Sequence, residues 1–103
     1  MAVRVQEAAS LRLDGIYCYT RERWGADQAG CHITDLFAAF DRIKRHGIAA
    51  RPIPAGFGVE GFYFRHEHHF VYWRRLSDGD IGIVTILHER MHQTDRFRND
   101  LGG

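Results

Sequence analysis

The chain has very little lysine and very little net charge. Only Lys44 is a lysine among its 14 lysine and arginine residues, and the formal net charge is +1. No strong positive field draws the chain to nucleic-acid phosphates, so we expect no direct sequence-specific nucleic-acid binding. Arginine suits bidentate and stacked contacts, but a GC-rich genome produces the same bias, and the arginine content favours neither origin.

Long apolar runs and paired cysteines are also missing. No stretch approaches the roughly 18 apolar residues of a membrane span, and the chain does not open on a basic and then apolar leader. We therefore expect a cytoplasmic protein with no membrane partner. Cys18 and Cys31 form no CxxC pair and fall in segments with helical patterns, so we expect buried free thiols and not a disulfide or redox pair.

Two common sequence motifs of enzyme active sites are missing. The sequence contains no Walker A phosphate loop and no GxSxG nucleophile turn, and we expect no cofactor. A chain of 103 residues rarely divides, so we expect one domain over residues 1–103.

The hydrophobic pattern of the first half predicts a strand and two helices. Ala2–Gln6 alternates as a strand does, and a helical stripe then runs through Glu7–Trp24 until Gly25 ends it. A second amphipathic helix spans Asp27–Arg45. Because a break of one or two residues joins the helices, they should form an antiparallel helical hairpin.

The second half of the chain predicts three strands. Residues 47–58 hold both prolines and should form an irregular loop. Strands follow at Val59–Arg65, His69–Leu76 and Ile81–His88, and the third is apolar enough to be interior and buried on both faces. Met91–Leu101 should be a short terminal helix or tail. The expected fold is α+β, an antiparallel-rich sheet in the order β-α-α-β-β-β with the helical hairpin on one face.

The segment Arg65–Phe70, RHEHHF, is the densest group of histidines. His66 and His68 would share a strand face and could offer two nitrogens to a metal, but a zinc site needs three or four ligands. The segment also has to turn one strand into the next, which should splay the imidazoles. We favour a solvated hairpin tip over a metal site or a binding surface, and we expect no metal.

The segment Leu87–His92, LHERMH, lies where the buried strand should leave the sheet. A His–Glu–Arg cluster there could do acid–base work on a phosphodiester, with Arg90 stabilising charge. His88 and His92 would need helix on both sides to share a metal, and His88 should still be strand. We favour a polar strand end with structural hydrogen bonds over catalysis.

The segment Phe70–Arg75, FVYWRR, combines aromatic and arginine side chains. Exposed surfaces of this composition stack RNA bases, but aromatics in a sheet covered by helices are usually core. We favour one buried face and one face that offers a groove to a partner protein.

Two segments together resemble the ParE branch of the ParE/RelE toxin superfamily, the toxins of bacterial type II toxin–antitoxin modules. The first is LDGIYCYTRERWGADQA, Leu13–Ala29, and the second is HHFVYWRRLSDGDIGIVTILHERM, His68–Met91. The residues that match the family patterns are Tyr19-Thr20, Trp24-Gly25, Gln28-Ala29, His68-His69, Tyr72-Trp73-Arg74 and Ile86-Leu87-His88-Glu89-Arg90-Met91. The fold that this resemblance implies, β-α-α-β-β-β with a C-terminal helix, agrees with the predicted order.

The resemblance implies a growth-inhibiting toxin that a cognate ParD-like antitoxin, usually a ribbon-helix-helix DNA-binding protein, holds inactive. ParE-like members poison DNA gyrase without being enzymes, whereas RelE-like members cut mRNA on the ribosome. A ribosome-dependent nuclease benefits from a basic face, but from Arg51 onward arginines and acids balance and lysine is absent. We therefore favour gyrase as the target.

The alternatives assign different residues to the site. For gyrase inhibition no residue is catalytic, and we expect partner contacts on an open sheet face and the C-terminal segment, at Trp73, Arg75, His88, Arg90, Met91, Arg96 and Phe97. The antitoxin should use an apolar groove between helical hairpin and sheet, with arginines that attract an acidic tail. The alternatives are an inactive homologue that only binds its antitoxin and an endoribonuclease whose acid–base set is His88, Arg90, Arg65 and Tyr72.

Overall fold

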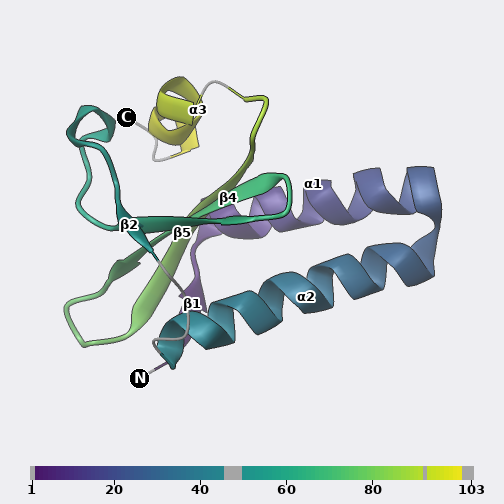
Figure 1. The fold of residues 1–103 in the computed structure, drawn as a ribbon, viewed down its shortest axis with the longest axis horizontal. Helices are drawn as coiled ribbons and strands as arrows, with labels where there is room; N and C mark the ends of the chain where they lie inside the picture. The colour runs from purple at the N-terminus through teal and green to yellow at the C-terminus, as the bar shows by residue number, and fades with distance from the viewer. Residues whose placement is uncertain (1, 46–49, 92, 101–103) are drawn as a thin grey trace.

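The computed structural model describes residues 2–45, 50–91 and 93–100 (Figure 1). Its elements are β1 (Val3–Val5), α1 (Glu7–Trp24), α2 (Ala26–Lys44), β2 (Arg51–Pro52), the 3₁₀ helix η1 (Ala55–Phe57), β3 (Phe62–His66), β4 (His69–Arg75), β5 (Ile81–His88) and α3 (Gln93–Asp100). The predicted α+β order is confirmed, with two additions. The short β2 and η1 lie in the segment that the sequence predicted to be irregular.

The strands form one sheet in the order β1-β5-β4-β3-β2. β1 runs parallel to β5, and the other neighbours are antiparallel. β5 lies between β1 and β4, and every residue from Ile81 to Leu87 is buried, as its apolar composition predicted. The two edge strands are short, so β5 and β4 make up the centre of the sheet.

A bulge in β5 sets which side chains face the helices. Tyr72 lies opposite Thr85 but Trp73 lies opposite Ile83, so one residue of β5 has no counterpart on β4. The bulge shifts the alternation of side chains by one residue. As a result Ile83 and Ile86, three residues apart, both pack on the helix-facing side.

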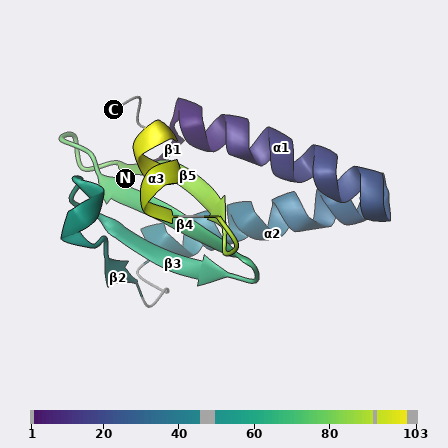
Figure 2. The same cartoon turned by 90° about the horizontal axis from the view of Figure 1, so that it is seen from above.

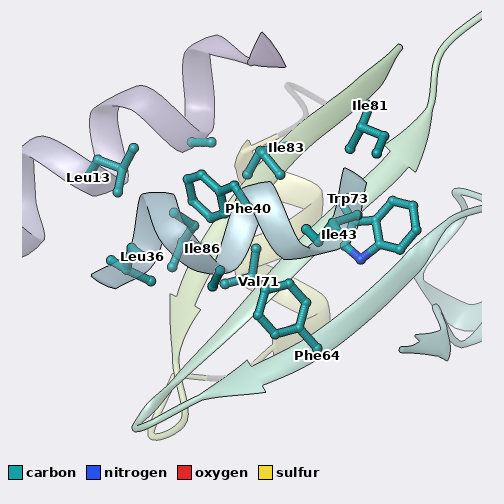
Figure 3. Close-up of a cluster of buried hydrophobic side chains, with 12 residues drawn as sticks. Leu13, Leu36, Phe40, Ile43, Phe64, Val71, Trp73, Ile81, Ile83 and Ile86 are labelled. Carbon is teal, nitrogen blue, oxygen red and sulfur yellow. The ribbon is translucent and has the colours of Figure 1, made fainter. Parts of the chain in front are cut away.

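The helical hairpin covers one face of the sheet (Figures 1 and 2). Leu36 and Phe40 of α2 are almost fully buried against strand residues such as Val71 and Ile86 (Figure 3). Gly25 joins the helices with a positive φ of 92°, a conformation that glycine adopts without strain. Its N–H donates to the Arg21 carbonyl and its own carbonyl accepts from Ala29 N–H, so one residue ends α1 and starts α2.

The far end of the hairpin projects beyond the sheet (Figure 2). Trp24 is 64% exposed and Tyr19 is 52% exposed there, because no strand lies beneath them. Cys18 and Cys31 are free, as predicted, but both are exposed, so the prediction of buried thiols is wrong. Their helical segments were identified correctly, but each cysteine lies on the solvent side of its helix. None of the helices in residues 2–45, 50–91 and 93–100 has the length and hydropathy of a membrane span.

The other face of the sheet carries a second, smaller core under α3 and η1. Phe97 of α3 is fully buried, and its ring centroid lies 5.1 Å from those of both Phe57 and Tyr72. The open sheet face that the sequence predicted is not found where α3 covers it, so that expectation is wrong there (Figure 2). A polar segment with a single central aromatic side chain is sufficient to cover this face.

Candidate functional site

The turn between β3 and β4 consists of two residues, Glu67 and His68. His66 and His69 lie directly opposite each other across the hairpin. Glu67 has a φ of 54°, which side chains other than glycine adopt rarely. Both turn residues are exposed, so the prediction of a hairpin tip is confirmed for them. The prediction does not hold for His66 and His69, which flank the turn and are partly buried.

Five imidazoles meet at this end of the sheet, and we call them the histidine cluster: His32, His66, His68, His69 and His88. His69 lies opposite both His66 of β3 and His88 of β5, so the three form a row across adjacent strands. His32 of α2 lies 5.7 Å from His69 and 6.3 Å from His66 between ring centroids. The expectation that the turn would splay the imidazoles is therefore wrong for His66 and His69, because a two-residue turn returns both to one face.

Burial controls the charge of the central imidazole. Desolvation, with further contributions from His88 and His32, lowers the pKa of His69 from 6.5 to about 4. His69 is therefore uncharged at neutral pH. Among the residues that the structure describes, no three histidine, cysteine, aspartate or glutamate side chains are arranged to hold a metal ion.

Glu89 ties the turn to the segment that follows β5. Its Oε1 lies 2.9 Å from His68 Nδ1, and its Oε2 accepts a 2.5 Å hydrogen bond from Arg65. Its backbone N–H donates to the His68 carbonyl. The hydrogen bond from His68 and the charge of Arg65 lower the pKa of Glu89, so this carboxylate stays ionised at neutral pH. The polar strand end with structural hydrogen bonds that the sequence favoured is confirmed.

Gln93 joins the start of α3 to the sheet. Its Nε2 donates to the carbonyls of His88 and Met91, at 2.8 and 2.9 Å, and its Oε1 accepts a 2.7 Å hydrogen bond from the Tyr72 hydroxyl. Burial raises the pKa of Tyr72 to about 12, so the phenol keeps its proton at neutral pH. No sequence pattern singled out Gln93, because its role depends on three groups that only the fold brings together.

The structure does not assemble the four residues of the nuclease alternative. Tyr72 packs under α3 on one face of the sheet, whereas His88 contacts the histidine cluster on the other. His88 Nδ1 accepts the backbone N–H of Arg90, and Arg65 is bound to Glu89. Tyr72 and His88 of the proposed acid–base set therefore lie on opposite faces of the sheet.

Two strings of motif letters also occur in the chain, but in the wrong structural setting. Residues 88–92 spell HExxH, which binds zinc only from a helix, yet β5 extends through His88. His92 lies outside the described residues. Residues 56–61 spell GxGxxG, but they connect η1 to β3 and not a strand to a helix.

The expected partner-contact residues are divided between several places. Arg90 and Met91 follow the end of β5 and Arg96 lies on α3, and all three are at least partly exposed. Arg75 is exposed at the opposite end of β4. Trp73 is 6% exposed and stacks on Phe62, and Phe97 is fully buried, so the expectation that these two rings lie on an open surface is wrong.

Comparison with known families decides the class of this fold. A family described as "ParE toxin of type II toxin-antitoxin system, parDE" matches residues 3–93, from β1 to the start of α3. The chain belongs to the ParE toxin family. The resemblance noted in the sequence is thereby confirmed, and the chain is a toxin of the type II toxin–antitoxin class.

Individual relatives agree with the ParE family. The chain is 33% identical to Toxin ParE1 of Mycobacterium tuberculosis over 87 residues, which cover 82% of this chain and 85% of that protein. It is 32% identical to Toxin ParE of Escherichia coli over 95 residues, which cover 92% and 91%. A solved structure titled "Chromosomal ParDE TA system from P. aeruginosa" shares the fold, with a TM-score of 0.66 and 21% identity over 85% of this chain and 95% of that one.

The Tyr72 hydroxyl provides a test of how α3 is held. Tyr72→Phe is expected to lower the free energy of unfolding by about 1 kcal/mol, because Gln93 loses a donor while the ring keeps its packing. Urea denaturation measures the change. Tyr63→Phe, a neighbouring tyrosine on the same face, serves as the control and should change stability by less than about 0.5 kcal/mol. Equal losses in both variants would contradict the role assigned to Gln93.

Proposed function

We propose that this ParE-family toxin inhibits bacterial growth by poisoning DNA gyrase and that a cognate ParD-like antitoxin neutralises it. The family match over residues 3–93 is the observation that carries the proposal. The separation of Tyr72 from His88 by the sheet supports a non-enzymatic inhibitor over a nuclease. Gyrase acts on the bacterial chromosome, so the proposal places the toxin in the cytoplasm.

The proposed gyrase-contact surface is the end of β5 together with α3. Arg90 and Arg96 are exposed there and Met91 is partly exposed, and Gln93 fixes α3 to the strand end beside them. Mixed arginine and apolar side chains on a well-anchored support are typical of contact sites that contribute most to affinity. Arg75 lies at the other end of β4, beside Ile81, and is therefore outside this surface.

The proposed antitoxin surface is on the helical hairpin. The core residues of α2, such as Leu36 and Phe40, fill the space between the hairpin and the sheet, so the expected apolar groove is occupied. Exposed apolar side chains of the hairpin offer an alternative, at Leu11, Tyr19, Trp24 and Phe37. Arg23 lies over the Tyr19 ring at 4.7 Å, which places a positive charge beside them for an acidic antitoxin segment. That the antitoxin is of the ribbon-helix-helix type is part of the proposal.

A cleavage assay with purified gyrase and supercoiled plasmid tests the target without a ribosome. The toxin is expected to trap cleaved DNA, seen as linear plasmid after denaturation of the enzyme. The double variant Arg90→Ala, Arg96→Ala should lose at least about tenfold in potency, since arginine anchors at interfaces contribute strongly to binding. Arg42→Ala, an exposed arginine on α2, is the matched control and should stay within about twofold.

The same samples distinguish the other functions. Cleavage of mRNA in a translating extract, lost on His88→Ala, with no trapped gyrase–DNA complex would replace the proposal by a ribosome-dependent nuclease. Expression without any effect on bacterial growth would leave an inactive homologue that only binds its antitoxin.

A further inference from the structure

The histidine cluster joins a helix to three strand ends. Centroid distances are 5.7 Å from His32 to His69, 5.2 Å from His69 to His88 and 6.3 Å from His68 to His88. The strand members are held by the hydrogen bonds of the sheet. His32 is the member that belongs to a helix, and α2 is held on the sheet by side-chain packing.

Each of the two inner imidazoles of the cluster, His66 and His69, has one buried nitrogen without a hydrogen-bond partner among the described residues. These nitrogens are His66 Nε2 and His69 Nδ1. A protonated imidazole donates from both nitrogens, so charging either ring would leave a buried donor unsatisfied.

The charged groups around His69 also disfavour a proton on it. The groups that face it are all basic: His88 from β5, His32 from α2, His66 from β3 and His68 from the turn. The two carboxylates of this region bind other members of the cluster. Glu89 binds His68 and Arg65, and exposed Glu67 lies 3.5 Å from His32 Nδ1.

We propose that the histidine cluster is an acid-sensitive latch between α2 and the sheet. At neutral pH the uncharged His69 ring lets α2 pack on the ends of β3, β4 and β5. In acid, a proton on His69 places a positive charge in a buried site beside other basic side chains, with the ring centroids of His32 and His88 at 5.7 and 5.2 Å. The strands remain paired through their backbones, so the latch opens by movement of α2 near His32 away from the sheet.

The pH range of the latch follows from the direction of the pKa shift. Because the pKa of His69 is lowered from 6.5 to about 4, the unfolded chain binds this proton more readily than the folded chain. The stabilisation is complete above the ordinary histidine pKa and is lost progressively as the pH falls from 6.5 towards 4. The pKa of Glu89 is lowered below its ordinary 4.5, so this carboxylate stays ionised between pH 7 and pH 5.

Thermal unfolding followed by circular dichroism between pH 7 and pH 5 tests the latch. The melting temperature of the unmodified chain is expected to fall by about 5 °C or more over this range. In small domains even a modest loss in the free energy of unfolding lowers the melting temperature by several degrees. His69→Phe keeps a ring of similar size that cannot be charged. The melting temperature of this variant should therefore fall less than half as far over the same pH range. His68→Phe removes an outer member of the cluster, at a side chain that is 70% exposed, so it should reduce the decrease less than His69→Phe does, whatever its absolute stability.

Two further measurements locate the effect and cover a variant that fails to fold. Hydrogen exchange, corrected for intrinsic rates, should show protection of α2 near His32 falling at least about tenfold more than protection of α3. In the unmodified chain, the ring signals of His69 should titrate well below pH 6. A flat melting temperature, the same slope in His69→Phe, equal exchange in both helices, or an ordinary titration of His69 would each overturn the proposal.

Discussion

Gly61→Ala is expected to lower the free energy of unfolding by about 3 kcal/mol, because the added methyl group has no space at this position. An ideal Cβ would lie 2.6 Å from the Trp73 carbonyl oxygen and 3.0 Å from Ile53 Cδ1. The Gly61 carbonyl also accepts the Ile53 N–H at 2.9 Å, so the backbone cannot move away without breaking a hydrogen bond. The methyl group would therefore push β3 away from β4 or break the link to Ile53.

Gly82→Ala is the matched control for this prediction. Its Cβ would meet Leu76 Cδ2 at 3.0 Å and Gln6 Cδ at 3.5 Å, and both atoms are at the far ends of side chains that can turn away. A loss below about 1 kcal/mol is expected. Urea denaturation of both variants with an unchanged m value gives the comparison. Equal midpoints would mean that the close approach at Gly61 relaxes as easily as that at Gly82.

Phe97→Ala is the second change with a large expected effect, a loss of about 3–4 kcal/mol together with release of α3. The fully buried ring contacts Phe57 and Tyr72, and this packing holds α3 on the sheet. Without the ring, α3 would keep the hydrogen bonds of Gln93 but lose this buried packing. Because Arg96 is on the same helix, gyrase poisoning should fall as well if the proposed contact surface is correct.

Arg96→Ala separates the two effects of Phe97→Ala. This side chain is exposed, so its removal should change the free energy of unfolding by less than about 0.5 kcal/mol. Urea denaturation reports stability, and limited proteolysis reports whether α3 stays docked. A Phe97→Ala protein that keeps α3 protected and loses less than 1 kcal/mol would contradict the anchoring role.

The elements of the fold follow from local patterns, and their predictions succeeded for that reason. The apolar stripe of α1, the break at Gly25 and the apolar run of β5 are each visible within a window of fewer than 20 residues. The side of the sheet on which a residue lies was harder to predict. The bulge opposite Tyr72 and Trp73 shifts the alternation of β5, and a two-residue turn at Glu67 returns His66 and His69 to one face.

The candidate site was harder to predict from the sequence, because it is formed by contacts between distant segments. His32 joins the histidine cluster from α2, more than 30 residues before His66, and no spacing rule connects the two. Trp73 was expected on an open sheet face, but it faces the hairpin and stacks on Phe62. Covering of one face by α3 could have been suspected from Phe97, an isolated aromatic side chain in a polar segment.

The parallel pairing of β1 with β5 determines when during synthesis this toxin can become complete. Val3 lies beside Ile81, so β1 can pair with its neighbour only after the chain has been made as far as β5. Until then the helical hairpin has no β5 to cover Leu36 and Phe40, and its apolar side stays in contact with water. Pairing over such a distance along the chain slows folding and prolongs exposure of apolar surface. A newly made chain therefore passes through an immature stage in which the end of β5, part of the proposed gyrase-contact surface, has not yet formed.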